Sequence, residues 1–236
     1  MYTRFIQLIT GVLVLLAGKS WAAEMSMSQS TKIETSASVD VVSAYIFRGA
    51  TLNKGAAVQP GVEMAIGGAT IGVWGSQAMD AEETETEQEV DVYASYDIDL
   101  SGATLTFGAV EYIYPGEDID NDREVSIGIG FDTFLSPSIA VNYGIGGAVE
   151  ETSYTEFGIE EGVFEEGDFS ASLGAAVGYL DPEGGTAGFS HTQLIASASF
   201  SMISASLNYF LEMDDEVQSF EDAEEFYVSV GTAYAF

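Results

Sequence analysis

The chain ends with the sequence Phe226-Tyr-Val-Ser-Val-Gly-Thr-Ala-Tyr-Ala-Phe236, in which large apolar and small side chains alternate. Successive side chains of a strand point to opposite faces, so one face carries Phe226, Val228, Val230, Tyr234 and Phe236. The other face carries mainly Ser, Gly and Ala. One apolar face and one compact, weakly polar face are typical of a strand in a transmembrane β-barrel. The alternative is an edge strand of a soluble sandwich.

The first 22 residues have the features of a secretory signal peptide. Arg4 provides the positive start, residues 5–17 are largely apolar, and Ser20-Trp21-Ala22 provides the small residues of a cleavage site. This apolar run is too short to span a bilayer as a helix. We therefore divide the chain into a signal peptide (1–22), an N-terminal periplasmic segment (23–37) and a barrel (38–236).

The chain that follows is strongly acidic and contains no cysteine. Its formal charge changes from −32 to −34 when residues 1–22, which include Arg4 and Lys19 but no acid, are removed. This charge excludes electrostatic binding of nucleic acid, and the lack of cysteine excludes disulfides and thiol catalysis. Beyond residue 22 no apolar run is long enough for a transmembrane helix, so a chain that spans the membrane must do so as a barrel.

The alternation seen at the C-terminus recurs along the chain and predicts an all-β fold, an antiparallel up-and-down transmembrane barrel of about twelve strands. Residues 90–99 show it most clearly, with Val90, Val92 and Tyr96 on one face and Asp91, Tyr93 and Asp97 on the other. The predicted strands are 38–48, 58–66, 69–78, 90–99, 103–114, 124–132, 138–147, 153–163, 169–179, 192–202, 203–211 and 226–236.

The predicted connections alternate between short turns and longer, mostly acidic loops. The short set is 67–68, 101–102, 135–137, 165–168 and 202–203, and the long set is 50–57, 79–89, 115–122, 149–152, 180–191 and 212–225. Strict alternation of this kind is the layout of an outer-membrane barrel, whereas a soluble sandwich gives no reason for it. An even number of strands further predicts that both termini lie in the periplasm.

Five short motifs between residues 39 and 115 resemble a known family. They are Ser43-Ala-Tyr-Ile-Phe-Arg-Gly49, Gln59-Pro-Gly61, Trp74-Gly-Ser76, Glu89-Val-Asp-Val-Tyr-Ala-Ser-Tyr96 and Tyr112-Ile-Tyr-Pro115. In order and spacing they resemble the TorF-type porin family, the Gcw_chp group of proteobacterial outer-membrane proteins. The resemblance implies an outer-membrane channel of undefined solute. The chain departs from the family in having few basic residues after the signal peptide: Lys32, Arg48, Lys54 and Arg123.

The terminal strand also resembles the signal that the barrel-insertion machinery reads in outer-membrane proteins. We therefore expect Phe226, Val228, Val230, Tyr234 and Phe236 to act as the assembly signal. The expected partners are outer-membrane lipid, the barrel-assembly machinery with periplasmic chaperones, and small solutes, with no nucleic acid among them.

Inward positions of the predicted strands carry acids and aromatic residues. Arg48 has two interpretations that the sequence leaves open: one pole of a transverse field across a pore, or a buried ion pair that plugs the lumen and fixes the wall. The aromatic residues are expected to fill the lumen rather than to guide a sugar. The lumen-facing candidates are Asp40, Arg48, Glu63, Trp74, Asp91, Tyr93, Asp97 and Glu124.

Two chemical alternatives have little support in the sequence. His191 is the only histidine; we expect it to be solvated at the outer rim, with Ser190 on the opposite face and Ser197 about 20 Å away along the strand. The acidic segment 117–122 lacks the glycine and the closing glutamate of a helix-loop-helix calcium site. We therefore predict no catalytic residues, no metal site and no cofactor.

The predicted function is passive diffusion of small polar or cationic solutes through a narrow acidic lumen in the outer membrane. The alternative is a closed structural or adhesive barrel that displays acidic loops. Small inward residues favour the channel because they leave room in a barrel of this size. These inward glycines are Gly128, Gly130, Gly144, Gly146, Gly174 and Gly178.

Overall fold

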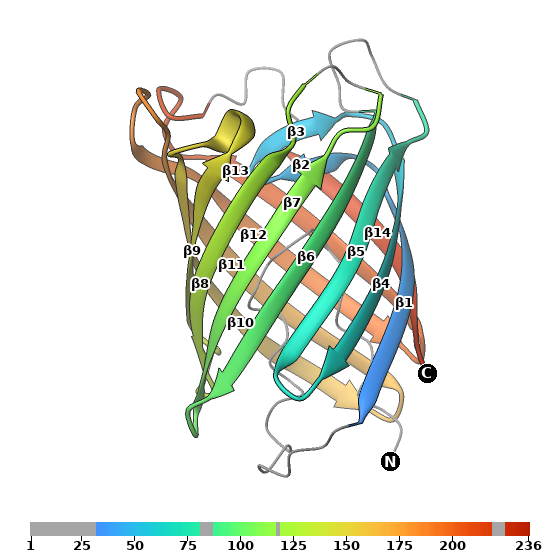
Figure 1. Ribbon diagram of the computed structural model, residues 1–236. Helices are drawn as coiled ribbons and strands as arrows, with labels where there is room; N and C mark the ends of the chain where they lie inside the picture. Colours follow the sequence, from blue (N-terminus) through green and yellow to red (C-terminus); the bar gives the residue numbers. More distant parts are fainter. Residues whose placement is uncertain (1–31, 81–86, 117–118, 219–224) are drawn as a thin grey trace.

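The computed structural model describes residues 32–80, 87–116, 119–218 and 225–236, which form a closed antiparallel β-barrel of twelve strands (Figure 1). Each wall strand pairs with its neighbour in the sequence, and β1 pairs with both β4 and β14, which closes the barrel. The predicted fold class is therefore confirmed, and the soluble sandwich is excluded. The signal peptide (1–22) lies outside the described residues.

The wall strands are nine to fourteen residues long and differ from the predicted ones mainly at their ends. They are β1 (Ile33–Val42), β4 (Ala57–Ile66), β5 (Ala69–Ala78), β6 (Gln88–Asp99), β7 (Ala103–Ile113), β8 (Asp122–Phe131), β9 (Ser138–Gly146), β10 (Ser153–Glu166), β11 (Phe169–Asp181), β12 (Gly188–Phe200), β13 (Ile203–Glu212) and β14 (Phe226–Ala235). A short hairpin, β2 (Tyr45–Phe47) with β3 (Ala50–Asn53), stands apart from the wall, and one 3-10 turn, η2 (Gly147–Val149), follows β9.

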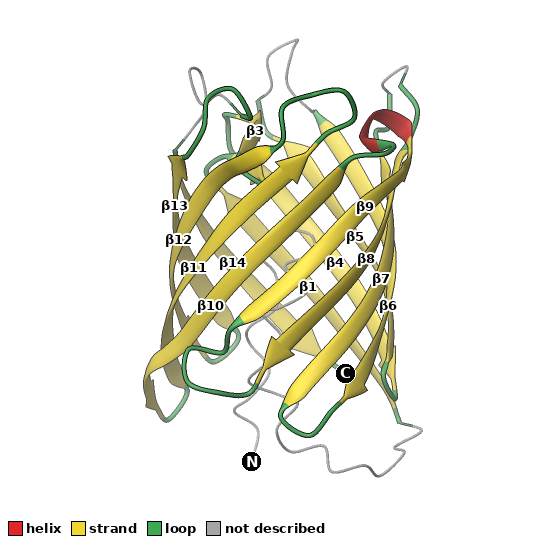
Figure 2. Ribbon diagram, turned by 90° about the vertical axis from the view of Figure 1, so that its left-hand side faces the viewer, coloured by secondary structure: helices red, strands yellow, loops and turns green. Residues whose placement is uncertain are grey.

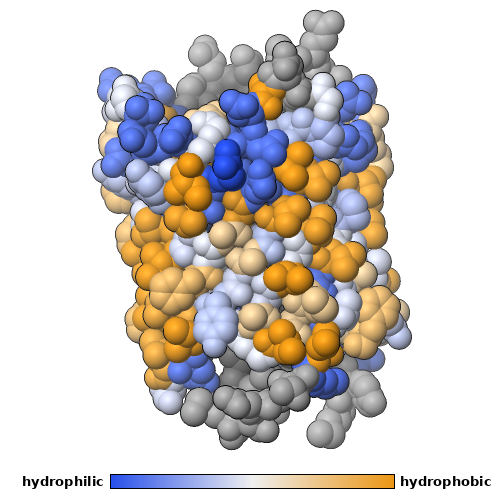
Figure 3. Space-filling view, viewed as in Figure 1, coloured by the Kyte–Doolittle hydropathy of each residue, from blue (hydrophilic) through white to orange (hydrophobic). Residues whose placement is uncertain are grey.

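The two faces of the wall differ in the way that the alternating sequence predicts. Outward side chains are large and apolar, as at Ile71 and Val230, which are 52% and 50% exposed, whereas inward Trp74 and Asp91 are 4% and 0% exposed. Figure 3 shows apolar side chains over the strands and hydrophilic ones gathered at the upper end. So much exposed apolar surface is stable only against lipid. None of the helices among the described residues is long and apolar enough to cross a membrane.

The two ends of the barrel have different connections (Figures 1 and 2). Short turns such as Gly67-Gly68 and Ser101-Gly102 join strands at one end, here called the turn end, where β1 also starts and β14 finishes. Gly67 has φ +60° and Gly102 has φ +116°, a backbone region in which glycine carries no steric cost. The longer connections lie at the other end, here called the loop end.

Two of the predicted strands have boundaries that are wrong in ways that affect the lumen. The first strand begins at Ile33 rather than Ser38, and it ends at Val42 instead of continuing to Arg48. The strand predicted to begin at Thr192 begins at Gly188 and therefore includes His191. In both places, chain that was predicted to lie along the wall or in an outer loop faces the interior.

Candidate functional site

The loop half of the lumen is occupied by a segment of the chain itself, residues 43–56, here called the inward hairpin. It leaves the wall between β1 and β4, where Val42 still pairs with Ala57. The Ser43 N–H donates to the Val228 carbonyl of β14 (2.9 Å), and the Val228 N–H donates to the Ser43 hydroxyl (3.0 Å). Beyond Ser43 the chain turns inward, and β2 and β3 pair with each other rather than with the wall.

The tip of the inward hairpin is a tight turn at Arg48-Gly49. Both residues have positive φ, 51° and 81°, as the favoured two-residue hairpin turns require. A Cβ on Gly49 would lie 2.8 Å from Nδ1 of His191, so only glycine fits there without displacing the imidazole. The turn therefore brings the Arg48 side chain to the far wall of the barrel.

Arg48 forms a bidentate ion pair with Glu124 of β8. Its two terminal nitrogens donate to the two carboxylate oxygens at 2.7 and 2.8 Å, and its guanidinium lies 4.6 and 4.5 Å from the ring centroids of Phe47 and Tyr154. The Tyr112 hydroxyl also donates to Glu124 (2.9 Å). Removing one partner of such a pair leaves an uncompensated buried charge, at a cost of roughly 3–5 kcal/mol.

This arrangement corrects the expected environment of Arg48. The sequence placed Arg48 at an inward position of a wall strand, whereas it lies at a hairpin tip and pairs with Glu124. Of its two interpretations, the structure has the ion pair that plugs the lumen and fixes the wall. A guanidinium whose charge is taken up by one carboxylate contributes little to a transverse field.

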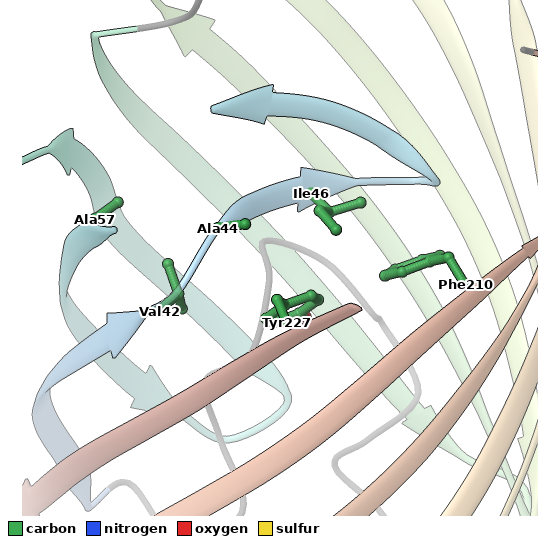
Figure 4. Close-up of a cluster of buried hydrophobic side chains, with 6 residues drawn as sticks. All are labelled: Val42, Ala44, Ile46, Ala57, Phe210 and Tyr227. Atoms are coloured by element: carbon green, nitrogen blue, oxygen red, sulfur yellow. The ribbon is translucent and has the colours of Figure 1, made fainter. Parts of the chain in front are cut away.

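The sides of the inward hairpin pack against two walls of the barrel. On one side Ala44 and Ile46 form a buried cluster with Phe210 of β13 and Tyr227 of β14 (Figure 4). On the other side Tyr45 packs on Trp74 of β5 and Phe47 on Tyr112 of β7, with ring centroids 5.6 and 5.8 Å apart. The hairpin thus contacts strands on several sides of the barrel and occupies the loop half of the lumen.

His191 is buried in this half of the lumen, which contradicts its predicted place at a solvated rim. Gly178 of β11 pairs with His191 while Tyr179 pairs with Phe189, so Ser190 is an extra residue in β12. This bulge turns both Ser190 and His191 inward, where each is 0% exposed. The His191 ring stacks on Tyr154 with a centroid distance of 6.2 Å, and a Cβ on Gly178 would lie 2.6 Å from it.

The Ser190 hydroxyl lies 3.0 Å from Nδ1 of His191, the spacing of a nucleophile and its base. Neither side chain has exposed surface, so no substrate reaches the pair in this conformation. Its evident role is packing, because the imidazole contacts Gly49 at the hairpin tip and Phe210 in the wall.

The predicted lumen acids divide between the two halves of the barrel. In the turn half, Tyr93 donates to Glu63 (2.7 Å) and Thr106 donates to Asp97 (2.6 Å). Asp91 is completely buried beneath the inward hairpin. Asp40 of β1 is also buried and lies against Gly231, the neighbouring inward position of β14.

The remaining wall, β11 to β14, is neutral and lined with serine. The Ser170 and Ser199 hydroxyls are hydrogen-bonded at 2.7 Å, and the Ser206 and Ser229 hydroxyls at 2.8 Å. The inward acids Glu63, Asp91, Asp97 and Glu124 lie on β4, β6 and β8, away from this wall of hydroxyls.

The inward glycines do not all leave space in the lumen. Gly178 accommodates His191 and Tyr154, a Cβ on Gly146 would contact the Arg123 side chain, and Gly144 lies against the backbone of Val149. At Gly128 and Gly174 the nearest atoms are 3.4 and 3.3 Å from an added Cβ, and they belong to neighbouring strands. In the loop half, therefore, small residues make room for protein groups rather than for solute.

A family model described as "Bacterial protein of unknown function (Gcw_chp)" matches residues 26–236. No curated protein matches the chain. One solved structure, reported as "Unveiling the Mechanism Behind the in-meso Crystallization of Membrane Proteins", has a TM-score of 0.50 at 9% identity, over 86% of this chain and 84% of the other. At this identity the likeness shows the fold alone.

Two solved porins are more distant in structure. The NanC porin has a TM-score of 0.48 at 10% identity, over 86% of this chain and 99% of its own. A Salmonella typhi OmpF complex with daunomycin has a TM-score of 0.41 at 9% identity, over 87% and 97% of the two chains.

Proposed function

The chain belongs to the Gcw_chp family of bacterial proteins, and from this premise we propose that it is a narrow channel for passive diffusion of small polar or cationic solutes across the outer membrane. The observation that carries the proposal is the lining of the turn half. Carboxylates and serine hydroxyls face inward there, on a closed barrel whose outer face is apolar. Polar interiors of this kind line the water-filled channels of porins.

The preference for cations follows from the charges that remain in the lumen. Among the described strands and the hairpin tip, Arg48 is the only arginine or lysine that points inward, and it is paired with Glu124. Glu63 and Asp97 are hydrogen-bonded by neutral donors, which leaves their negative charge uncompensated. A narrow lumen screens such charges less than bulk water does, so they favour cations.

The same proposal orients the protein in the membrane. The turn end, with both termini, faces the periplasm after export and removal of residues 1–22, and the acidic loops face the cell surface. Solutes then enter past the loops and pass the inward hairpin before they reach the acidic turn half. The hairpin makes this passage narrow, so the conductance should be small.

A closed structural barrel remains the second candidate because the side chains of Ala44, Tyr45 and Ile46 in the inward hairpin are buried against the wall. Recording from purified protein in a planar bilayer distinguishes the two functions. We expect small, stable conductance steps in symmetric KCl, with heat-denatured protein as the control. A correctly folded barrel that inserts into the bilayer and never conducts would favour the scaffold.

Deleting Phe236 should reduce assembly of the barrel strongly. Phe236 continues the outward apolar row of β14, its ring packs on Tyr234 with centroids 5.2 Å apart, and its N–H donates to the Thr35 carbonyl of β1 (2.9 Å). We expect at least a tenfold lower yield of heat-modifiable barrel in the outer membrane. A tenfold loss corresponds to about 1.4 kcal/mol in recognition of the assembly signal. Deletion of residues 24–26 is the control. Normal yield without Phe236 would refute the assembly signal.

A further inference from the structure

Asp91 lies beneath the inward hairpin without a hydrogen-bond donor. Its side chain is 0% exposed, and neither of its carboxylate oxygens has a hydrogen-bond partner among the described residues. Burial of an ionised carboxylate without a compensating group is strongly unfavourable. The environment of Asp91 therefore requires either a proton or a cation.

The donors around Asp91 do not reach its carboxylate oxygens. Its two cross-strand neighbours are Trp74 on β5 and Tyr112 on β7. The Trp74 indole N–H makes no hydrogen bond, and the Tyr112 hydroxyl donates to Glu124. Arg48 uses both terminal nitrogens on Glu124 as well. The nearest guanidinium thus stabilises the adjacent carboxylate rather than Asp91.

A second buried carboxylate lies on the same face of β6. Glu89, two residues before Asp91, is 3% exposed. Two buried carboxylates at adjacent positions of one face repel each other, and a cation between them lowers that repulsion. Tyr45 of the inward hairpin lies beside them. Its hydroxyl is buried and has no hydrogen-bond partner among the described residues.

We propose that Glu89 and Asp91, with the Tyr45 oxygen, bind a hard metal cation in the lumen beneath the inward hairpin. Carboxylate and neutral oxygens are the ligands that calcium prefers, and water completes its coordination when few protein ligands are present. The described residues contain no group of three or more His, Cys, Asp or Glu that could hold a metal ion. The proposed site therefore has only two carboxylate ligands. The bound ion joins β6 to β2 and so holds the hairpin in place. The inference rests on the proposed function in one respect: the cation must be able to enter the lumen.

The test is thermal stability of the full exported protein, purified in neutral detergent free of lipopolysaccharide. Heat modifiability is measured in EDTA and in Ca²⁺ at constant ionic strength. A ligand present at about 100 times its dissociation constant should raise the midpoint by roughly 5–10 °C. Asp91→Asn, which keeps the side-chain shape, should abolish this Ca²⁺ shift. Asp40→Asn removes an equally buried inward acid on another wall and should retain the shift.

Terbium, which substitutes for calcium at oxygen sites, provides a second measurement. The chain has two tryptophans, and Trp21 lies in the predicted signal peptide, so Trp74, opposite Asp91, is the only tryptophan sensitiser in the exported protein. We expect Trp-excited terbium emission that Ca²⁺ displaces and that Glu89→Gln or Asp91→Asn removes.

Two results would overturn the site. An equal Ca²⁺ shift in the parent and Asp91→Asn proteins would place the ion elsewhere, and loss of the shift in Asp120→Asn alone would place it on an outer loop. No shift and no emission would leave a shared proton between Glu89 and Asp91. The readouts do not depend on conductance, so a non-conducting barrel that shows the Asp91-dependent shift would refute the channel and retain the site.

Discussion

Replacing residues 45–53 with a short Gly-Ser linker will raise the single-channel conductance several-fold. These residues are β2, β3 and the turn between them, which fill the loop half of the lumen and contact β5, β7, β8, β10, β12, β13 and β14. Their removal leaves the wall intact because Val42 and Ala57 pair directly, so a short linker is enough to join β1 to β4. The measurement is conductance in symmetric KCl.

The matched control replaces residues 182–187, the connection between β11 and β12 at the loop end, with the same linker. This change shortens a loop without touching the inward hairpin, and the conductance should stay close to that of the parent. Heat modifiability of both variants verifies that each barrel has formed. An unchanged conductance in the folded 45–53 variant would show that the hairpin does not limit the passage.

The wall of the barrel was predictable from the sequence because each strand carries its own evidence. In β14, Val228 and Val230 point to lipid while Ser229 points to the lumen, and the same alternation holds in β6 and β9. Lipid on one side and a lumen on the other impose a period of two on every strand, so the pattern survives uncertain boundaries. The inward placement of Asp40, Trp74, Asp91 and Glu124 follows from that pattern.

The inward hairpin was not predictable by the same criterion. Tyr45-Ile-Phe continues the alternation of β1, so the strand read as unbroken although the chain leaves the wall after Val42. The available signal was Arg48-Gly49 between two short apolar runs, which is a two-residue turn with glycine at a position of positive φ. The partner of Arg48 could not be inferred, because Glu124 is 76 residues away on the far wall.

The bulge in β12 is a second local departure from the period of two. A single extra residue, Ser190, turns both itself and His191 inward. No feature of the sequence near Phe189 marks that bulge, and without it His191 would fall on the predicted rim. Tertiary packing decides the position of the His191 side chain, because Gly178 and Gly49 leave the space that its imidazole occupies.

Cation selectivity is the second large effect expected, and it depends on the turn half of the lumen. Glu63 and Asp97 accept hydrogen bonds from neutral donors there, while Arg48 is paired with Glu124. Salt screens exposed charges beyond about 8–10 Å, so selectivity should increase as salt is diluted. The double variant Glu63→Gln with Asp97→Asn keeps the hydrogen-bonding shape of both side chains and should lower the selectivity markedly.

The most direct measurement is the reversal potential of the purified protein in a planar bilayer under a KCl gradient. KCl is suitable because its two ions diffuse in water at nearly equal rates. The sign of the reversal potential therefore shows which ion the lumen prefers. We predict a potential of the sign set by K⁺, larger in dilute salt and reduced by the double variant. A potential of the sign set by Cl⁻, or one that the double variant leaves unchanged, would contradict the acidic channel.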